Sequence, residues 1–144
     1  MKTWVIPARL EQIDLICSEL RRWLTEQNMQ AHQFGFELLL REALNNAILH
    51  GCKLNPDRHV EIEFSRKGSE LKITINDDGS GFDWRSLIQR DLVETERENG
   101  RGLKLYQLYS DHFEFNDPGN QVTLVRLTNQ ENSSPTSQNK REGT

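Results

Sequence analysis

Two polar residues stand out on the amphipathic segment from Phe36 to Gly51, FELLLREALNNAILHG. Glu42 and Asn46 are one helical turn apart, so on a helix they stack along one border of its apolar stripe. There a carboxylate can act as a general base, and a carboxamide oxygen can ligate Mg²⁺, a hard cation that prefers oxygen. Polar residues that border an amphipathic helix are also common as plain solvated surface. The pair has a chemical meaning only if the rest of the chain supplies a pocket beside it.

Two glycine-bearing segments further along can supply other parts of a ligand site. Asp77, Gly79 and Gly81 lie in NDDGSGFD, a loop that follows an expected strand and in which glycine lets the backbone approach a ligand closely. Asp77 offers an acceptor for the exocyclic amine of adenine. Gly100 and Gly102 lie in NGRG, just before an expected helix whose N-terminal N–H groups can hold phosphates. Taken singly, DxGxG is as typical of an ordinary turn, and GRG before a helix is more often a plain N-terminal flank than a phosphate site.

Length and composition favour a single acidic domain. The chain has 144 residues, a formal net charge of -4, and two cysteines, Cys17 and Cys52, without the spacing of a metal or disulfide site. The acidic excess argues against a dedicated nucleic-acid binder. The sequence shows neither a signal peptide nor an uninterrupted apolar run of roughly 18 residues. We therefore expect a cytoplasmic protein without a membrane span, with free thiols and with Cys17 packed in the core.

Hydrophobic periodicity predicts the elements that must position these residues. Alternating apolar residues predict strands over residues 3–7, 59–66, 70–76, 113–116 and 121–128, the first of them suited to a sheet edge. Three- and four-residue spacing predicts helices over 8–28, 36–51 and from 103 onward, with a short lid helix within 84–98. We expect Gly51 to cap the second helix and His50 to pack or cap at its end. This order indicates an α+β fold, a two-layer sandwich with helices on one face of a mostly antiparallel sheet.

The same pattern predicts a core and a tail. On the second helix, the stripe expected to be buried consists of Phe36, Leu39, Leu40, Ala43, Leu44, Ala47 and Ile48. On the first helix, the apolar positions are Leu10, Ile13, Leu15, Ile16, Leu20, Trp23 and Leu24. Residues 129–144 contain no apolar side chain, so we expect a disordered tail there and one folded domain over residues 1–128.

The segments EALNNAILHG, NDDGSGFD and NGRGL, in this order, resemble the N, G1 and G2 boxes of the ATPase superfamily that includes gyrase, heat-shock chaperones and histidine kinases. Its nucleotide-binding domain is called the Bergerat fold. Within the superfamily, the E-x-x-x-N-A-x-x-H-G form and the small size are most similar to bacterial anti-sigma factor serine kinases. The resemblance covers roughly residues 5–128.

The resemblance implies a role for each matching residue. Glu42 would be the general base that takes the proton of a substrate serine hydroxyl, and Asn46 would bind Mg²⁺. Asp77 would read adenine. The other ATP-binding positions would be Gly79, Gly81, Gly100, Arg101, Gly102 and Leu103. Arg101 and Lys104 are candidate phosphate contacts, although charged residues at a helix start are more often simply solvated.

One departure from the superfamily concerns the adenine site. Many members carry a Gly-Thr pair before the last strand, and its hydroxyl supports the adenine. Here Gly119 is followed by Asn120 and Gln121, with Thr123 further along. Adenine would then be supported differently or bound more weakly. The lid is also short, which disfavours the large ATP-driven clamps of the gyrase type.

The resemblance implies an ATP-dependent protein serine kinase that sequesters a sigma factor or an equivalent regulator. Its phosphoryl acceptor would be a serine on an antagonist with a STAS-type domain. The alternative is a nucleotide-responsive sequestration module that no longer transfers phosphate. The catalytic half of a histidine kinase is disfavoured, because the sequence has no dimerising helical hairpin with an acceptor histidine and because a glutamate base suits a serine acceptor. Members of the family commonly dimerise, and the sequence does not decide whether this chain forms a homodimer.

Overall fold

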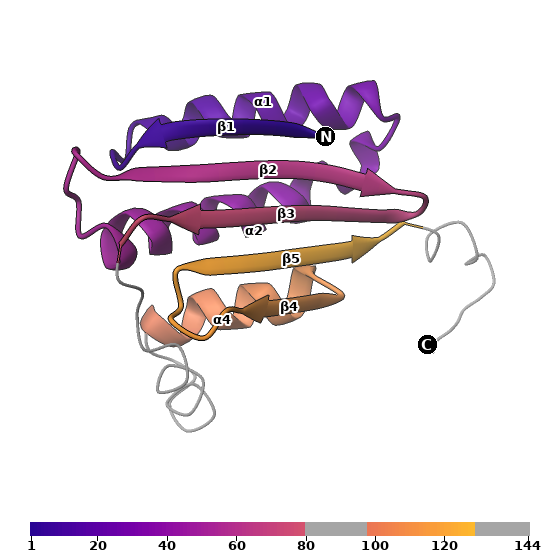
Figure 1. Ribbon diagram of the computed structural model, residues 1–144. Helices are drawn as coiled ribbons and strands as arrows, with labels where there is room; N and C mark the ends of the chain where they lie inside the picture. Colours follow the sequence, from indigo (N-terminus) through magenta and orange to yellow (C-terminus); the bar gives the residue numbers. More distant parts are fainter. Residues whose placement is uncertain (80–97, 129–144) are drawn as a thin grey trace.

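The computed structural model describes residues 1–79 and 98–128 (Figure 1). Within these ranges the strands form one five-stranded sheet in the order β1-β2-β3-β5-β4, in which all neighbouring strands are antiparallel. The strands are β1 (Lys2–Pro7), β2 (His59–Lys67), β3 (Glu70–Asp77), β4 (His112–Phe115) and β5 (Gln121–Leu127). The helical elements are α1 (Gln12–Glu26), the 3-10 turn η1 (Gln30–His32), α2 (Gln33–Asn46), the π-helical turn η2 (Ala47–Gly51) and α4 (Glu98–Tyr109).

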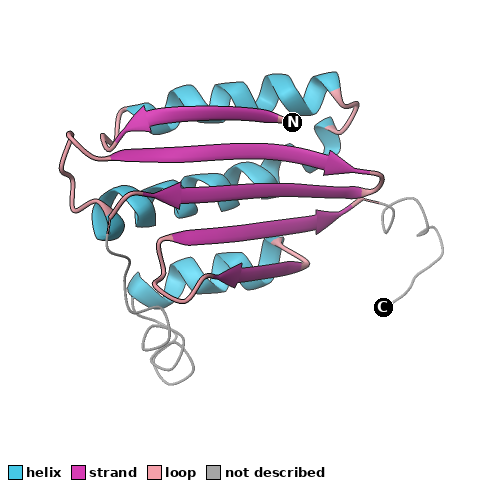
Figure 2. Cartoon of the chain, viewed as in Figure 1, coloured by secondary structure: helices cyan, strands magenta, loops and turns pink. Residues whose placement is uncertain are grey.

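The helices cover one face of the sheet and leave the other face open (Figure 2). Strand β2 shows the cause, because Val60, Ile62 and Phe64 are buried while the intervening Glu61 is exposed. The α+β two-layer prediction is confirmed, and β1 lies at the sheet edge as expected. In the described part of the chain, no helix combines the length and hydrophobicity needed to span a bilayer.

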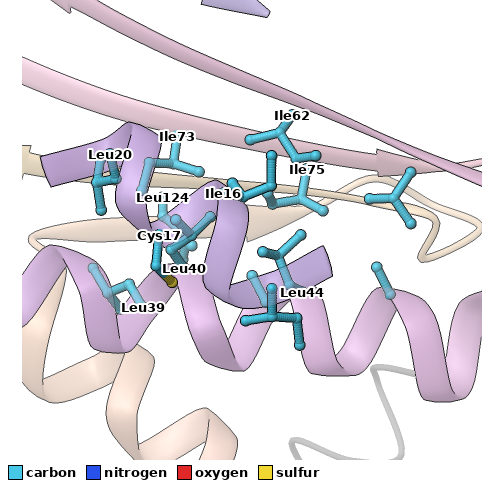
Figure 3. Close-up of a cluster of buried hydrophobic side chains, with 14 of the residues drawn as sticks. Ile16, Cys17, Leu20, Leu39, Leu40, Leu44, Ile62, Ile73, Ile75 and Leu124 are labelled. Carbon is cyan, nitrogen blue, oxygen red and sulfur yellow. The ribbon is translucent and has the colours of Figure 1, made fainter. Parts of the chain in front are cut away.

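The core lies between the sheet and helices α1 and α2. All seven residues of the predicted α2 stripe are buried. Figure 3 shows Leu40 and Leu44 of α2 beside Ile16 of α1 and beneath Ile75 of the sheet. Each fully buried side chain of this size contributes about 1.5–3 kcal/mol. This burial fixes which side of α2 faces the sheet.

The α1 face is partly different from the prediction. Leu10 precedes the helix and is 42% exposed, and Leu15 is 60% exposed. The buried face consists of Ile13, Ile16, Cys17, Leu20, Trp23 and Leu24. At about 100° per residue Leu15 falls outside this arc, whereas Cys17 falls inside it. The expectation that Cys17 is packed is confirmed.

An ion-pair network holds α1 against α2 on the outer surface of the helix layer. Arg21 donates two hydrogen bonds to the carboxylate of Glu37, at 2.9 and 2.7 Å. Arg41 reaches the same carboxylate at 3.3 Å and Asp14 at 2.9 Å. The hydrogen bonds from Arg21 lower the pKa of Glu37. The network fixes the register of the two helices, although such solvent-facing pairs stabilise a fold only slightly.

Two helix starts differ from the prediction. Asn28 has φ 58°, and the chain is helical again from Gln30, so α2 begins at Gln33 and not at residue 36. Helix α4 begins at Glu98, so Gly100 and Gly102 lie inside its first turns and not in a preceding loop. Tertiary context overrides the helix penalty of glycine, which is about 1 kcal/mol per residue. The expected lid helix within 84–98 and the expected tail 129–144 lie outside the described residues, except for Glu98.

The end of the second helix also differs from the prediction. His50 is exposed, so of the packing or capping role expected for it, packing into the core is not observed. Gly51 is the last residue of η2, and the left-handed conformations follow at Lys53 (φ 54°) and Leu54 (φ 60°). A Cβ added at Gly51 would lie 2.3 Å from Oδ2 of Asp77. Gly51 is therefore required for a close approach between η2 and the end of β3, and not as a left-handed cap.

Gly79, in the loop after β3, lies at the same close approach between η2 and the end of β3. A Cβ added there would lie 2.0 Å from the carbonyl oxygen of Gly51 and 3.0 Å from Oδ1 of Asp77. Two glycines from distant parts of the sequence thus enclose one carboxylate. The loop after β3 and the end of the second helix are held in direct contact.

We expect the free energy of unfolding to fall as the pH rises from about 9 to about 11. Burial raises the pKa of the Cys17 thiol from its usual 9.0 to about 11, partly opposed by Arg41. Over this range the unfolded chain loses a proton that the folded chain keeps, which costs roughly 3 kcal/mol for this group. Urea unfolding at a series of pH values measures the decline. Cys17→Ala should make it shallower, with a remainder from Cys52, whose pKa burial also raises to about 11. Equal slopes in the two proteins would contradict this account.

Gly51→Ala should destabilise the fold by roughly 1–3 kcal/mol, because the added methyl group overlaps the Asp77 carboxylate. Denaturant unfolding measures the change. The matched experiment is a double-mutant cycle with Asp77→Ala, which removes the overlapping atoms. In that background the cost of Gly51→Ala should largely disappear, and strictly additive costs would show that the close approach is not the cause.

Candidate functional site

Three chain segments meet at one end of the sheet (Figure 1). They are the end of the second helix, the end of β3 and the turn between β4 and β5, and Tyr106 of α4 joins them in one pocket. A pocket with about 250 Å³ of empty space, including the solvent at its mouth, opens between the helix layer and the sheet close to this end. Its lining residues are Ala43, Asn46, Ala47, Ile75, Asp77, Tyr106, Phe115, Gly119, Asn120, Gln121 and Val122.

The pocket brings together two of the residues singled out by type and spacing. Asn46 enters it from α2, and Asp77 enters it from the last position of β3. Glu42 is half-buried one helical turn before Asn46 and is not a lining residue. Its negative charge nevertheless acts on the hydroxyl of Tyr106, which does line the pocket. Glu42 therefore lies within electrostatic reach of the pocket wall.

Asp77 is an acceptor held in place by the backbone. Its side chain is only 5% exposed, and its Oδ1 accepts a hydrogen bond of 2.8 Å from the N–H of Gly79. Burial raises the pKa of Asp77, the Gly79 hydrogen bond opposes this, and the charge of Asp78 adds to it. A buried carboxylate with one fixed partner keeps free lone pairs for a donor such as an exocyclic amine.

The turn between β4 and β5 forms the pocket wall next to Asp77. Asn116 organises it, because its Oδ1 accepts from the N–H groups of Gly119, Asn120 and Gln121 at 2.9, 3.0 and 3.1 Å. Asn120 in turn donates from Nδ2 to the carbonyl oxygen of Gly79 at 3.4 Å. Asn120 follows Gly119, the position at which the resemblance implied a threonine. Its side chain contacts the loop after β3.

Thr123 does not take over the role of the missing threonine. It pairs with Thr74, whereas the adjacent Val122 pairs with Ile75 and lines the pocket. Because successive side chains on a strand point to opposite faces, Thr123 lies on the open face of the sheet. The polar partner of Asp77 on this wall is therefore the Asn120 segment.

Sequence reasoning missed Tyr106 as a pocket residue and treated it only as an apolar position of the last helix. Its ring is 1% exposed, and its hydroxyl lies 3.1 Å from Nδ2 of Asn46. The available signal was chemical, since the hydroxyl of a buried tyrosine usually has a hydrogen-bond partner. Which partner it has could be known only from the packing of α4 on α2.

The remaining predicted positions belong to the glycine-bearing segments. The backbones of Gly100, Arg101, Gly102 and Leu103 are helical within α4, where the first turn leaves N–H groups without intrahelical acceptors. Their side chains and Gly81 lie outside what the structure describes. Lys104 is exposed, which agrees with a solvated position.

The residues present fit an adenine nucleotide and its Mg²⁺. The pocket walls are mostly apolar, and Asp77 supplies an acceptor at its polar end. Asn46 has its Nδ2 directed at Tyr106, so its Oδ1 is the atom left for a cation that prefers oxygen. The close approach of Gly51 and Gly79 encloses the Asp77 carboxylate, and a Cβ at either position would overlap with these neighbours.

Comparison with known proteins agrees with this fit. The chain matches the family model of the histidine kinase-like ATPase domain over residues 6–126. It is 30% identical over 102 residues to the anti-sigma F factor of Oceanobacillus iheyensis, covering 68% of this chain and 69% of that protein. It is 29% identical over 93 residues to the anti-sigma F factor of Bacillus cytotoxicus, covering 62% of this chain and 64% of that protein. A third anti-sigma F factor, from Clostridium perfringens, is 27% identical over 95 residues, which is 64% of this chain and 68% of that protein. Because the family model covers most of the chain and the pocket lies within the matched region, this protein belongs to the histidine kinase-like ATPase domain family.

Proposed function

We propose that the chain is an anti-sigma factor-type serine protein kinase that acts in the cytoplasm as a monomer or homodimer. It would bind Mg·ATP, sequester a sigma factor or an equivalent regulator, and phosphorylate a serine on a STAS-domain antagonist in a partner-switching pathway. The family assignment and the anti-sigma F factors among its relatives support the proposal. The single observation that carries it is the convergence of Asn46 and Asp77 on one pocket.

In this proposal each pocket residue has one task. Asp77 accepts a hydrogen bond from the exocyclic amine of adenine, and the apolar walls keep water from the ring. Asn46 holds the cation through Oδ1. The first turn of α4, which contains Gly100, presents backbone N–H groups to the phosphates. When bound, Mg·ATP supplies the γ-phosphoryl group, with the cation offsetting its negative charge.

Glu42 is the proposed general base. It would take the proton from the substrate serine hydroxyl while the serine oxygen bonds to the γ-phosphorus and ADP leaves. Its place on α2, one turn before Asn46, fixes the distance between the base and the cation ligand. Carboxylates are weak bases, so orientation of the two reactants must supply much of the rate.

Asn46→Ala should weaken Mg·ATP binding by at least on the order of 100-fold, because loss of a direct ligand should cost no less than loss of an outer-sphere partner. Isothermal titration calorimetry with a non-hydrolysable ATP analogue and Mg²⁺ measures the affinity. The matched control is Asn45→Ala, which removes the adjacent carboxamide that does not line the pocket. An Asn46→Ala protein that keeps its fold and the wild-type affinity would overturn the assigned role.

Glu42→Gln should lower phosphoryl transfer by about 10²–10⁴-fold and leave nucleotide affinity unchanged, since it removes the base and keeps the shape of the side chain. The assay follows label from ATP to a purified STAS-domain protein that carries an acceptor serine. Glu61→Gln, on the open face of β2, is the control. Wild-type protein that binds nucleotide but transfers no label would favour the sequestration module without kinase activity.

A further inference from the structure

Tyr106 has an unusual place for a core residue, because one end of it is packed and the other end reaches a polar group. Its ring lies 5.4 Å from that of Phe113 and 6.2 Å from that of Phe115. Its hydroxyl meets Nδ2 of Asn46 at 3.1 Å. Since the ring is fixed by its neighbours, the hydroxyl oxygen is a fixed point in the pocket wall.

In this contact the NH₂ side of the Asn46 carboxamide faces Tyr106, and Nδ2 donates to the hydroxyl oxygen. A carboxamide presents an oxygen on one side and an NH₂ group on the other, and the two are nearly equal in size. With Nδ2 donating to the Tyr106 hydroxyl, Oδ1 must face the other way. The reversed orientation would put the NH₂ group toward a cation, to which it cannot bind.

The hydroxyl also lies within the electrostatic reach of the proposed base. Burial raises the pKa of Tyr106 above its usual range, the hydrogen bond with Asn46 opposes the shift, and the charge of Glu42 adds to it. The hydroxyl on α4 thus contacts Asn46 of α2 and lies within electrostatic reach of Glu42 on the same helix.

We infer that Tyr106 is a positioning residue that orients the carboxamide of Asn46 so that its Oδ1 faces the cation of Mg·nucleotide. The inference rests on the proposed function, because it assigns a task toward the same cation. It goes beyond the proposed function by naming the residue that holds the metal-ligating side chain of Asn46. Metal sites depend in this way on outer-sphere hydrogen bonds that fix the ligating atom. It also connects α4, whose first turns carry Gly100 and Gly102, to the ligand on α2.

The test is Tyr106→Phe, which removes one hydroxyl and keeps the ring. The affinity for ADP is measured by calorimetry with Mg²⁺ and again with EDTA. The gain in affinity that Mg²⁺ provides should fall about 10-fold, while the affinity in EDTA should change less than about 2-fold. Tyr109→Phe is the matched control, since Tyr109 lies on the same helix and does not line the pocket. It should behave as wild type.

A second background separates orientation from packing. Asn46→Asp presents an oxygen on both sides, so its orientation no longer matters. In the Asn46→Asp protein, Tyr106→Phe should lower the gain in ADP affinity that Mg²⁺ provides by less than about 3-fold. Circular dichroism and urea unfolding confirm that each variant is folded.

The outcomes distinguish the two levels of the proposal. Equal losses with Mg²⁺ and with EDTA, or no loss at all, would overturn the positioning role and leave the nucleotide site in place. A Tyr106→Phe protein that does not fold would assign the hydroxyl to stability and overturn the role as well. Wild-type protein without any Mg²⁺-dependent nucleotide binding would remove the proposed function and this inference together.

Discussion

The burial of one stripe of α2 between α1 and the sheet is the constraint on which the site depends. Leu40 and Leu44 face inward among side chains from both layers, so α2 cannot rotate without exposing them to water. The rotation of the helix fixes where its polar border lies. Hydrophobic packing therefore places Asn46 at the pocket and Glu42 one turn before it, although neither belongs to the buried stripe.

A second constraint acts at the end of the same helix. Gly51 and Gly79 come within contact distance, and the carboxylate of Asp77 fills the space between them. Any larger residue at either position would separate the helix from the strand. The polar end of the pocket thus exists because two backbones approach closely, and its acceptor is oriented by the N–H group of Gly79.

A third set of contacts connects α2 and the end of β3 to the last helix, α4. Tyr106 lies on α4, packs on the aromatic rings of β4, and reaches Asn46 across the interface with α2. The Asn116 turn places Asn120 against the loop after β3, in the region where many superfamily members use a threonine. Each wall is built by a different kind of interaction: apolar burial for α2, backbone approach for Gly51, and side-chain hydrogen bonds for the turn.

The sequence alone determined the strands, the buried face of α2 and the order of the three polar segments. These follow from local periodicity and residue type, and the structure agrees closely on them. Only the tertiary structure decided that Gly51 serves a close approach, that Leu15 is exposed, that Gly100 lies inside a helix, and that Tyr106 reaches Asn46. These facts depend on contacts between residues far apart in the chain. Local sequence patterns record which side chains prefer burial, but they do not record which buried groups meet.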